Sequence, residues 1–401
     1  MIVQINKGSA AGRIQAPPSK SMAHRTLICG ALSSGSTVTG VEFSEDIKAT
    51  IACLKNLGAK VEIEGSTVKI GGLLENNSDI VNPLNCNESG STLRFLLPIC
   101  LLKGKSAVLS GKKRLFERSL SIYEEICNAQ GIKYKQTEDC VAVSGTLQSG
   151  LYEVRGDISS QFISGLLFAL PLLEADSRIV ITGKFESASY IGLTLKALGD
   201  FGIRVTRADA NTFYIPGSQS YKSKTVCVEG DYSNAAFFEA LNLFGGNVML
   251  KGLDEKSLQG DKVYKEYFFL LSGVKRELDL SDCPDLGPIL FAVAAAKGGG
   301  YFTGTGRLRI KESDRVAAMA EELAKFGIPV IADENSVTVG KAELKAPTVA
   351  LKGHNDHRIV MALSVLCTLT GGVIDGAEAV AKSLPDFYNR LASLGIEVKI
   401  K

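Results

Sequence analysis

Two cations and several hydroxyls gather near the start of the chain, in the run PPSKSMAHR at residues 17–25. The two prolines disfavour helix before them, and Ser19 or Ser21 can cap a helix that continues through an apolar stretch. Lys20 and Arg25 would then lie around a helix N-terminus, where free backbone N–H groups favour an anion. These residue types indicate a phosphate or carboxylate site, but a solvated basic turn explains this run by itself equally well.

Five further polar clusters precede apolar runs in the same way. Each apolar run is nearly continuous, which predicts a helix that is buried on most of its sides. Capping explains the serines and aspartates at these helix starts, but it does not explain the lysines and arginines that gather there. The clusters are residues 87–92, 156–161, 230–234, 282–285 and 353–358, and the six helices expected are 26–32, 93–102, 162–170, 235–243, 289–296 and 359–367.

Two basic runs lead to different interpretations. The run GKKRLFER at residues 111–118 is, by itself, typical of a solvated surface. In the run RLRIKESDR at residues 307–315, cations and carboxylates alternate between apolar segments, so we favour a functional site over a salt-bridged loop. Ser313 or Asp314 can cap a helix that begins at Val316.

The sequence lacks the signatures of several common enzyme classes. It contains no G-x-S-x-G elbow, and neither a G-x-x-x-x-G-K-[ST] nor a G-x-G-x-x-G run follows an expected strand. The three histidines and nine cysteines show no paired metal-ligand spacing, so we expect no metal. The odd number of cysteines, mostly in apolar contexts, predicts buried free thiols in a reducing compartment.

The composition is that of an ordinary globular protein. The chain has 401 residues, enough for two or three domains, with 45% hydrophobic and 22% charged residues. A formal net charge of +2 predicts no binding to nucleic acid or to an anionic membrane. The first residues show no signal-peptide core, and the longest apolar stretch, 162–173, is too short to span a bilayer. We therefore expect a soluble, cytoplasmic protein.

A repeated pattern runs along the chain, in which an apolar helix ends at a glycine and a short alternating strand follows. The period is roughly 70 residues, and the glycine is expected in the left-handed conformation that ends a helix. Six such units, in two groups of three, predict an α/β (α+β) fold of two pseudo-threefold domains with helix N-termini aimed at a shared cleft. The polar segment 218–224 is the expected hinge. The glycines are Gly58, Gly131, Gly202, Gly273, Gly327 and Gly395, and Val274 and Lys275 follow the fourth.

Several motifs fall in the order expected of one family, and the chain resembles the enolpyruvyl transferases, in particular the branch that acts on shikimate 3-phosphate. The resemblance runs nearly end to end. It implies two domains of three βαβαββ units each, with the substrate cleft between them. The implied limits are 1–17 plus 223–401 for the phosphoenolpyruvate side, with the catalytic carboxylates, and 18–222 for the shikimate 3-phosphate side. The motifs are PSKS with Arg25, SGS with Arg94, Arg118, SSQ at 159–161, KESDR at 311–315, NDHR at 355–358 and KSLPD at 382–386.

The resemblance implies a reaction between two anionic substrates, shikimate 3-phosphate and phosphoenolpyruvate, with neither a metal nor a cofactor. Several cations are needed to offset the repulsion between the substrates, and the planar fork of arginine suits carboxylate and phosphate. Carried over motif by motif, the expected ligands of shikimate 3-phosphate are Lys20, Ser21, Arg25, Ser159, Ser160, Gln161, Ser187, Tyr190, Asp285 and Lys311. Those of phosphoenolpyruvate are Lys20, Gly90, Arg118, Gln161, Arg315, Arg358 and Lys382.

The resemblance also implies acid–base roles. Asp285 is expected to accept the proton of the attacking 5-hydroxyl, and Glu312 to donate a proton to the methylene carbon. Burial would favour a protonated Glu312, but Lys311 and Arg315 would oppose it, so Lys20 is kept as an alternative donor. The chain departs from the common family pattern at His24, Glu88 and Arg307.

Two other functions fit parts of the pattern. The related transferase that acts on UDP-N-acetylglucosamine has an asparagine after the first lysine and a cysteine in the loop that here spans 111–118. This chain has Ser21 and no cysteine at those places. A non-catalytic anion-binding protein of the same fold would not need Asp285 and Glu312 together. We therefore expect the shikimate-pathway enzyme of aromatic amino-acid biosynthesis, the target of glyphosate, acting as a monomer.

Overall fold

The computed structural model describes residues 1–75, 80, 82–104, 106–273 and 276–401. Its internal contacts divide the chain into two compact units. Unit 1 consists of Met1–Ser19 with Glu229–Lys401, and unit 2 consists of Lys20–Val228. A separate cluster of buried hydrophobic residues forms the core of each unit.

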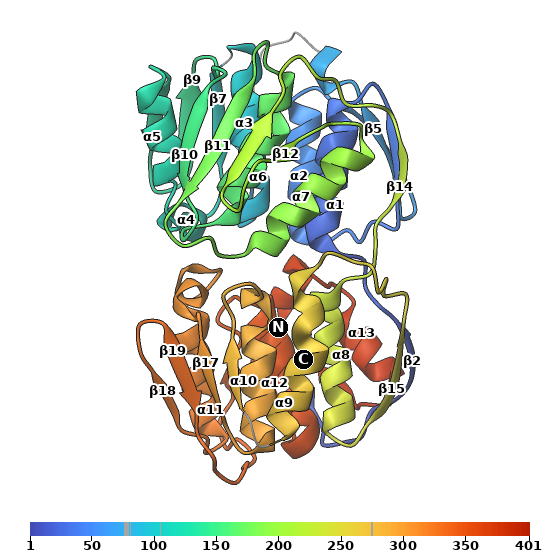
Figure 1. Ribbon diagram of the computed structural model, residues 1–401. Helices are drawn as coiled ribbons and strands as arrows, with labels where there is room; N and C mark the ends of the chain where they lie inside the picture. The colour runs from blue at the N-terminus through green and yellow to red at the C-terminus, as the bar shows by residue number, and fades with distance from the viewer. Residues whose placement is uncertain (76–79, 81, 105, 274–275) are drawn as a thin grey trace. The chain divides into compact units, whose positions relative to one another are not determined.

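Unit 2 contains three four-stranded sheets of one design (Figure 1). In strand order they are β14 (Thr225–Cys227), β3 (Ser36–Thr39), β5 (Thr67–Gly71) and β4 (Lys60–Glu64); β6 (Leu84–Asn85), β7 (Ser106–Ser110), β9 (Cys140–Ser144) and β8 (Lys133–Gln136); and β10 (Leu151–Arg155), β11 (Ser177–Thr182), β13 (Thr212–Ile215) and β12 (Thr206–Arg207). In each sheet the first pair is parallel and the other neighbours are antiparallel.

Helices fill the space between these sheets because a parallel strand pair requires a crossover connection. The helices of unit 2 are α1 (Lys20–Leu32), α2 (Glu45–Asn56), α3 (Gly90–Cys100), α4 (Lys113–Glu117), α5 (Ser121–Ala129), α6 (Ser160–Ala169) and α7 (Ala188–Asp200). The crossover from β6 to β7 contains α3, and the one from β10 to β11 contains α6. Both helices are buried almost throughout.

Unit 1 repeats the design in two four-stranded sheets and adds a parallel pair. The sheets are β16 (Glu277–Asp279), β17 (Gly300–Thr303), β19 (Ser336–Val339) and β18 (Val330–Ala332); β20 (Leu351–Lys352), β21 (Gly372–Asp375), β1 (Ile2–Ile5) and β22 (Val398–Ile400); and the pair β15 (Asn247–Lys251) and β2 (Ala11–Gln15). The helices are α8 (Tyr232–Leu243), α9 (Tyr264–Ser272), α10 (Gly287–Lys297), α11 (Arg315–Lys325), α12 (His357–Thr370) and α13 (Phe387–Ser393). Figure 1 shows α10 and α12 side by side within the unit, where they pack together.

The predicted α/β fold of repeated β–α units is confirmed, and so are the six buried helices. The observed helices begin two to six residues before the predicted apolar runs, in five cases because part of the polar cluster forms the first turn; the cluster 282–285 instead ends before α10, which begins at Gly287. Ser89 caps α3, Ser159 caps α6 and Asp231 caps α8, each by accepting a hydrogen bond from a backbone N–H of the first turn.

The predicted glycine caps are confirmed at five of the six positions. Gly58, Gly131, Gly202, Gly327 and Gly395 all have positive φ angles. The prediction is wrong at Gly273, where φ is −98° and the chain leaves α9 in an extended conformation. The next two residues, Val274 and Lys275, lie outside the described residues.

All nine cysteines are free thiols in the part of the chain that the structure describes, and seven of them are buried. The expected burial is wrong for Cys227, which is exposed. Among the described helices, none combines the length and the hydropathy that a membrane span requires.

Candidate active site

In unit 1, three carboxylates surround the guanidinium of Arg315. Its Nη1 donates to Oδ1 of Asp285 at 2.9 Å, and its Nη2 donates to Oε2 of Glu312 at 2.8 Å. Its Nε donates to Oδ2 of Asp356 at 2.9 Å. Arg315 is the first residue of α11, which Asp314 caps, and its side chain is only 1% exposed. The basic run 307–315 is therefore ion-paired, and its partners include the predicted catalytic carboxylates.

Three predicted residues of unit 1, Lys311, Arg315 and Arg358, converge on Asp285. It lies in the 3-10 turn η5 (Pro284–Leu286), before α10. Nζ of Lys311 is 3.4 Å from its Oδ1, and Nη2 of Arg358 is 3.4 Å from its Oδ2. Burial opposes the charged carboxylate, but Lys311, Arg358 and Arg315 outweigh burial and hold the pKa of Asp285 well below its usual range. In this arrangement Asp285 is a weak base.

For Lys311, the effect of burial on the pKa outweighs the effect of the neighbouring carboxylate. It follows the 3-10 turn η6 (Gly306–Ile310), and its side chain is 17% exposed. Burial lowers the pKa of Lys311 to about 8, although the neighbouring Asp285 raises it. Lys311 can therefore lose its charge in mildly alkaline solution, unlike the arginines around it.

The loop before α12 brings Arg358 and Lys382 into one neighbourhood. His354 and Asn355 have φ angles of 48° and 51°, a left-handed conformation that non-glycine residues adopt at a cost. Nζ of Lys382 donates to the carbonyl oxygen of Asn355 at 2.6 Å. Asp356 is fully buried and caps α12 by accepting from the backbone N–H of Arg358. The strained loop is thus fixed from both sides.

Glu321, Glu322 and His354 form a group whose ligand atoms lie close enough to hold a metal ion. Sequence reasoning considered only histidine and cysteine pairs and did not find this group. Nζ of Lys325 lies 2.8 Å from both carboxylate oxygens of Glu322, and Nε2 of His354 lies 2.8 Å from one of them. An ammonium group therefore already occupies the charge position that a cation would take. We interpret the group as an ion-pair network that supports the His354 loop.

In unit 2, Lys20 forms an ion pair with a residue that sequence reasoning did not assign. Lys20 is the first residue of α1, so Ser19 precedes the helix and Ser21 lies in its first turn. Nζ of Lys20 is 2.7 Å from Oδ2 of Asp46, in the first turn of α2. Both side chains are mostly buried, at 16% and 13% exposure.

Arg25 links α1 to α7. Its Nε donates to Oγ1 of Thr194 at 2.9 Å, and its terminal nitrogens donate to the carbonyl oxygens of Ser21 and Tyr190. The guanidinium also lies over the ring of Phe95, 5.2 Å from its centroid. Burial lowers the pKa of Arg25 to about 10. Three predicted ligands of shikimate 3-phosphate, Ser21, Arg25 and Tyr190, are therefore in direct contact.

Gly90 lies against two guanidinium groups. A Cβ at this position would be 2.7 Å from Nη1 of Arg94 and 3.0 Å from Nη1 of Arg118, so a larger residue would displace both. Nη1 of Arg94 also donates to Oε1 of Gln161, and Nε2 of Gln161 donates to Oγ of Ser91. The structure thus brings together Gly90, Arg118 and Gln161, which were predicted to bind phosphoenolpyruvate.

The predicted serines occupy helix starts. Ser159 caps α6, and Ser160 is the first residue of that helix and is buried. Ser187 precedes α7, is fully buried and has a φ angle of 56°. The basic run 111–118 is divided: Arg114 is exposed and pairs with Glu117, as expected of a solvated surface, whereas Arg118 faces Gly90.

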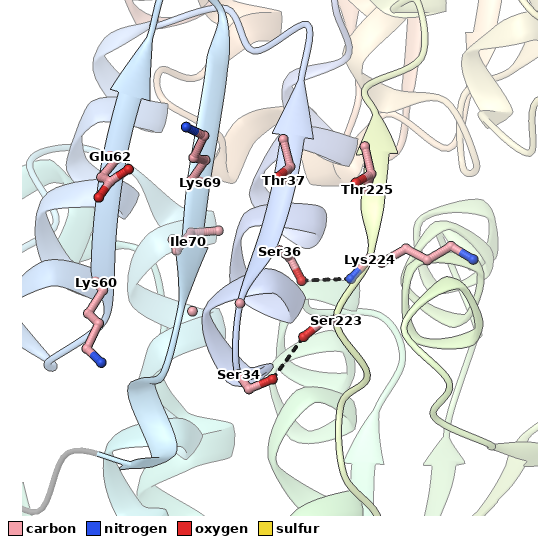
Figure 2. A pocket seen from close by; sticks show the side chains of 12 residues that line it. Ser34, Ser36, Thr37, Lys60, Glu62, Lys69, Ile70, Ser223, Lys224 and Thr225 are labelled. Carbon is pink, nitrogen blue, oxygen red and sulfur yellow. Dashed lines mark hydrogen bonds between the residues drawn. The ribbon is translucent and has the colours of Figure 1, made fainter.

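A pocket of about 450 Å³ in unit 2 lies elsewhere, beside the sheet that contains β3 and β14. Lys60, Lys69 and Lys224 line it, and Figure 2 shows their side chains pointing in different directions. None of the predicted site residues lines this pocket. It therefore does not belong to the candidate site.

Four residues of the candidate site were not assigned from the sequence. Arg94 and Asp356 were recognised as parts of motifs but given no role, whereas Asp46 and Asp261 were overlooked. Asp261 is buried, and burial together with the nearby Asp285 raises the pKa of Asp261 to about 7. The position of Asp356 as a capping aspartate before a cationic helix start could have indicated its role. No local signal distinguishes Asp46 or Asp261 from surface carboxylates.

Comparisons with known proteins agree along the chain. The family model described as EPSP synthase (3-phosphoshikimate 1-carboxyvinyltransferase) matches residues 5–268 and 271–391. The chain is 42% identical over 421 residues to the 3-phosphoshikimate 1-carboxyvinyltransferase of Clostridium kluyveri, covering 99% of this chain and 98% of the relative. It is 40% identical over 420 residues to the enzyme of that name from Clostridium botulinum strain Alaska E43, covering 98% and 97%.

Solved structures show the same fold. An EPSP synthase from Acinetobacter baumannii superimposes with a TM-score of 0.80 at 22% identity, covering 100% of both chains. The enolpyruvyl transferase NikO from Streptomyces tendae gives a TM-score of 0.76 at 15% identity, covering 99% of this chain and 98% of the other. At these identities the likeness concerns the fold alone.

Proposed function

The chain belongs to the EPSP synthase family, and on that premise we propose that it transfers the enolpyruvyl group of phosphoenolpyruvate to the 5-hydroxyl of shikimate 3-phosphate. The products are 5-enolpyruvylshikimate 3-phosphate and inorganic phosphate. The observation that carries the proposal is the convergence of Lys311, Arg315 and Arg358 on the carboxylate of Asp285. This arrangement pairs a proton acceptor with the cations that two anionic substrates need.

The proposed reaction is an addition followed by an elimination. In the addition, the 5-hydroxyl oxygen bonds to C2 of phosphoenolpyruvate, its proton passes to Asp285, and the methylene carbon C3 gains a proton. In the elimination, C3 returns a proton to the donor, the bond from C2 to the phosphate oxygen breaks, and the proton held by Asp285 leaves with the phosphate. Phosphate leaves, and the enolpyruvyl ether remains. No oxidant or reductant is needed.

The charges around Asp285 suggest how its basicity is controlled. The pKa of Asp285 is depressed because Lys311, Arg358 and Arg315 face it. A bound anion that draws one of these cations away weakens that effect, so the pKa of Asp285 rises towards the range of a useful base. We assign Asp285 as the proton acceptor on this basis.

The proton donor has two candidates. Glu312 contacts Arg315, which in turn contacts Asp285, so the two carboxylates share one guanidinium. Lys20 is held by Asp46. We propose Glu312 as the donor because it lies beside the acceptor within unit 1, and we keep Lys20 as the alternative.

The remaining ligands are proposed with the division expected from the sequence. Contacts of Arg25 with Ser21 and Tyr190 support one group for shikimate 3-phosphate. The approach of Arg118 to Gly90 supports a second group for phosphoenolpyruvate. The serines at the starts of α6 and α7 complete the first group, and Lys382 completes the second.

Product analysis with two acceptors tests the proposed function. The protein is incubated with phosphoenolpyruvate and either shikimate 3-phosphate or UDP-N-acetylglucosamine, and the acceptor that gains the enolpyruvyl group is identified by mass spectrometry. We expect the product only with shikimate 3-phosphate. Equal transfer to UDP-N-acetylglucosamine would contradict the assignment, and no transfer to either would favour a non-catalytic protein. The cytoplasmic location and the monomeric state stay predictions.

A further inference from the structure

Three helices of unit 2 that begin with predicted ligands, α1, α3 and α6, are joined by buried or partly buried polar contacts. Between α3 and α6, Arg94 donates to Gln161. Between α6 and α1, Ser164 is hydrogen-bonded to Thr194 of α7, which accepts from Arg25. Each of these two connections between helices includes a predicted substrate ligand, Gln161 or Arg25. The third connection, between α1 and α3, contains no predicted ligand.

The connection between α1 and α3 is a hydrogen-bonded chain of four side chains. Nδ1 of His24 lies 2.8 Å from Oγ1 of Thr50, which lies 2.6 Å from Oγ1 of Thr92. Oγ1 of Thr92 donates to Oγ of Ser89 at 2.7 Å. None of the four residues is more than 1% exposed. The chain passes from α1 through α2 to the cap of α3.

The direction of the last hydrogen bond determines all the others. A hydroxyl group has one proton, and that of Thr92 is directed to Ser89. Thr92 must therefore accept from Thr50, and Thr50 must accept from Nδ1 of His24. This direction requires a proton on Nδ1 of His24, and the buried Nε2 of His24 has no hydrogen-bond partner in the part of the chain that the structure describes. Burial, with Lys20 and Arg25 nearby, lowers the pKa of His24 well below its ordinary value, which agrees with the neutral form.

The two ends of the chain lie next to predicted ligands of different substrates. His24 is one helical turn after Lys20, and Ser89 directly precedes Gly90. The middle residue, Thr50, belongs to α2, and the same helix carries Asp46, the ion-pair partner of Lys20. The first turn of α2 therefore holds the ammonium group of Lys20 through Asp46. The next turn of α2 contacts α3 through Thr50.

We propose that His24, Thr50 and Thr92 are positioning residues that hold the first turn of α1, with Lys20, in register with the first turn of α3, with Gly90. None of the three is assigned to a substrate. The proposal rests on the proposed function, because that function places substrates at both helix starts. A buried chain of hydroxyls suits this purpose, since each hydrogen bond restricts the distance between two helices without adding a charge that would compete with the anions.

Threonine-to-valine exchange tests the proposal with little change of shape. Thr50→Val removes the central hydroxyl, and Thr50→Ser keeps it. Thr26→Val is the matched control, because the buried hydroxyl of Thr26 donates to carbonyl oxygens of its own helix, α1, and has no other partner among the described residues. We expect Thr50→Val to lower kcat/KM for both substrates about tenfold, and Thr50→Ser and Thr26→Val to stay within about twofold of the parent.

A second measurement does not depend on turnover. Nitrogen-15 NMR of the full chain, with His24→Asn used to assign the signal, reports which ring nitrogen of His24 carries the proton. We expect Nδ1 in the parent and in Thr26→Val, and a loss of that preference in Thr50→Val. A proton on Nε2 in the parent would overturn the proposed direction of the chain.

Kinetics that are the same in Thr50→Val and Thr26→Val would overturn the positioning role. If Thr50→Val does not fold, as judged by circular dichroism, Thr92→Val breaks the same chain at the next hydroxyl and must give the tenfold loss. A parent protein without any turnover contradicts the proposed function itself. An active parent with an unaffected Thr50→Val contradicts only the present proposal, so the two failures are distinct.

Discussion

The cations around Asp285 in unit 1 and the arginines at the helix starts of unit 2 are held in different ways. In unit 1 the contacts are between charges: Lys311, Arg315 and Arg358 face Asp285, Glu312 and Asp356. In unit 2, Arg25 donates to a hydroxyl and two carbonyl oxygens, and Arg94 donates to an amide and two carbonyl oxygens. The cations of unit 1 are thus balanced by carboxylates, whereas these two arginines of unit 2 are oriented by neutral groups.

This difference suggests that the two units have different roles in the reaction. A guanidinium that is oriented by neutral acceptors keeps its full charge for an incoming anion. A guanidinium that is paired with carboxylates instead controls the protonation of those carboxylates. We interpret unit 2 as the part that attracts and places anions, and the cluster around Asp285 as the part that moves protons.

The largest effect should come from removing the carboxylate at the centre of unit 1. We expect Asp285→Asn to lower kcat by about 10²–10⁴-fold, the usual contribution of a positioned general base. The matched control is Asp282→Asn, which neutralises an exposed carboxylate three residues earlier in the chain. Steady-state kinetics of both variants gives the comparison, and an unchanged kcat in Asp285→Asn would remove Asp285 from the mechanism.

An arginine of unit 2 should affect binding rather than chemistry. We expect Arg118→Ala to raise the KM for phosphoenolpyruvate about tenfold, because one charge-assisted hydrogen-bond partner is lost. The KM for shikimate 3-phosphate should change much less. Arg114→Ala is the control, since Arg114 lies on α4, just before Arg118, and its side chain is 38% exposed. Equal losses for both substrates in Arg118→Ala would contradict the division of ligands.

The activity should also depend on pH through Lys311 of unit 1. The pKa of Lys311 is about 8, so Lys311 is charged below that pH and loses its charge above it. We expect kcat/KM for shikimate 3-phosphate to fall as pH rises through about 8. In Lys311→Arg the same kcat/KM should stay constant around pH 8, because arginine keeps its charge. A parent profile that stays flat to pH 9.5, roughly the range over which this lysine would discharge, would contradict the role of Lys311.

Much of this site could be predicted where the signal is local. Helix starts follow from a capping side chain and the apolar run behind it, which explains why α3, α6 and α12 lie where they were expected. The glycine caps follow from backbone sterics in the same way. At Gly273 the prediction is wrong, because the chain leaves α9 there in an extended conformation, although the backbone N–H of Gly273 still donates to the carbonyl oxygen of Leu270.

Contacts between helices could not be predicted. Asp356 is 41 positions from Arg315, and Thr50 is 42 positions from Thr92. Neither the polarity nor the spacing of these residues marks them as partners, because the partner is chosen by how the helices pack. The ion pair between Lys20 and Asp46 joins two helix starts for the same reason. The resemblance to a family supplied ligand residues, but not the groups that hold them.

The smallest expected effect is on stability, and it concerns the neutral histidine of unit 2. The folded-state pKa of His24 is depressed, so the unfolded chain binds more protons as pH falls below about 6.5. The stability present above that pH is therefore lost on acidification, by at most about 1.4 kcal/mol per pH unit for one group. Urea unfolding is measured between pH 5 and 7, roughly the titration range of this histidine. The slope of the unfolding free energy against pH should be smaller for His24→Asn than for the parent. Identical slopes would contradict a buried neutral His24.

Phosphate release is the most direct measurement of the central claim, that this chain joins two anionic substrates at a site built around Asp285. The parent protein is mixed with phosphoenolpyruvate alone, with shikimate 3-phosphate alone and with both, and inorganic phosphate is followed over time. Steady release only when both substrates are present is the predicted result. Release from phosphoenolpyruvate alone at the same rate, or no release with both, would contradict the claim.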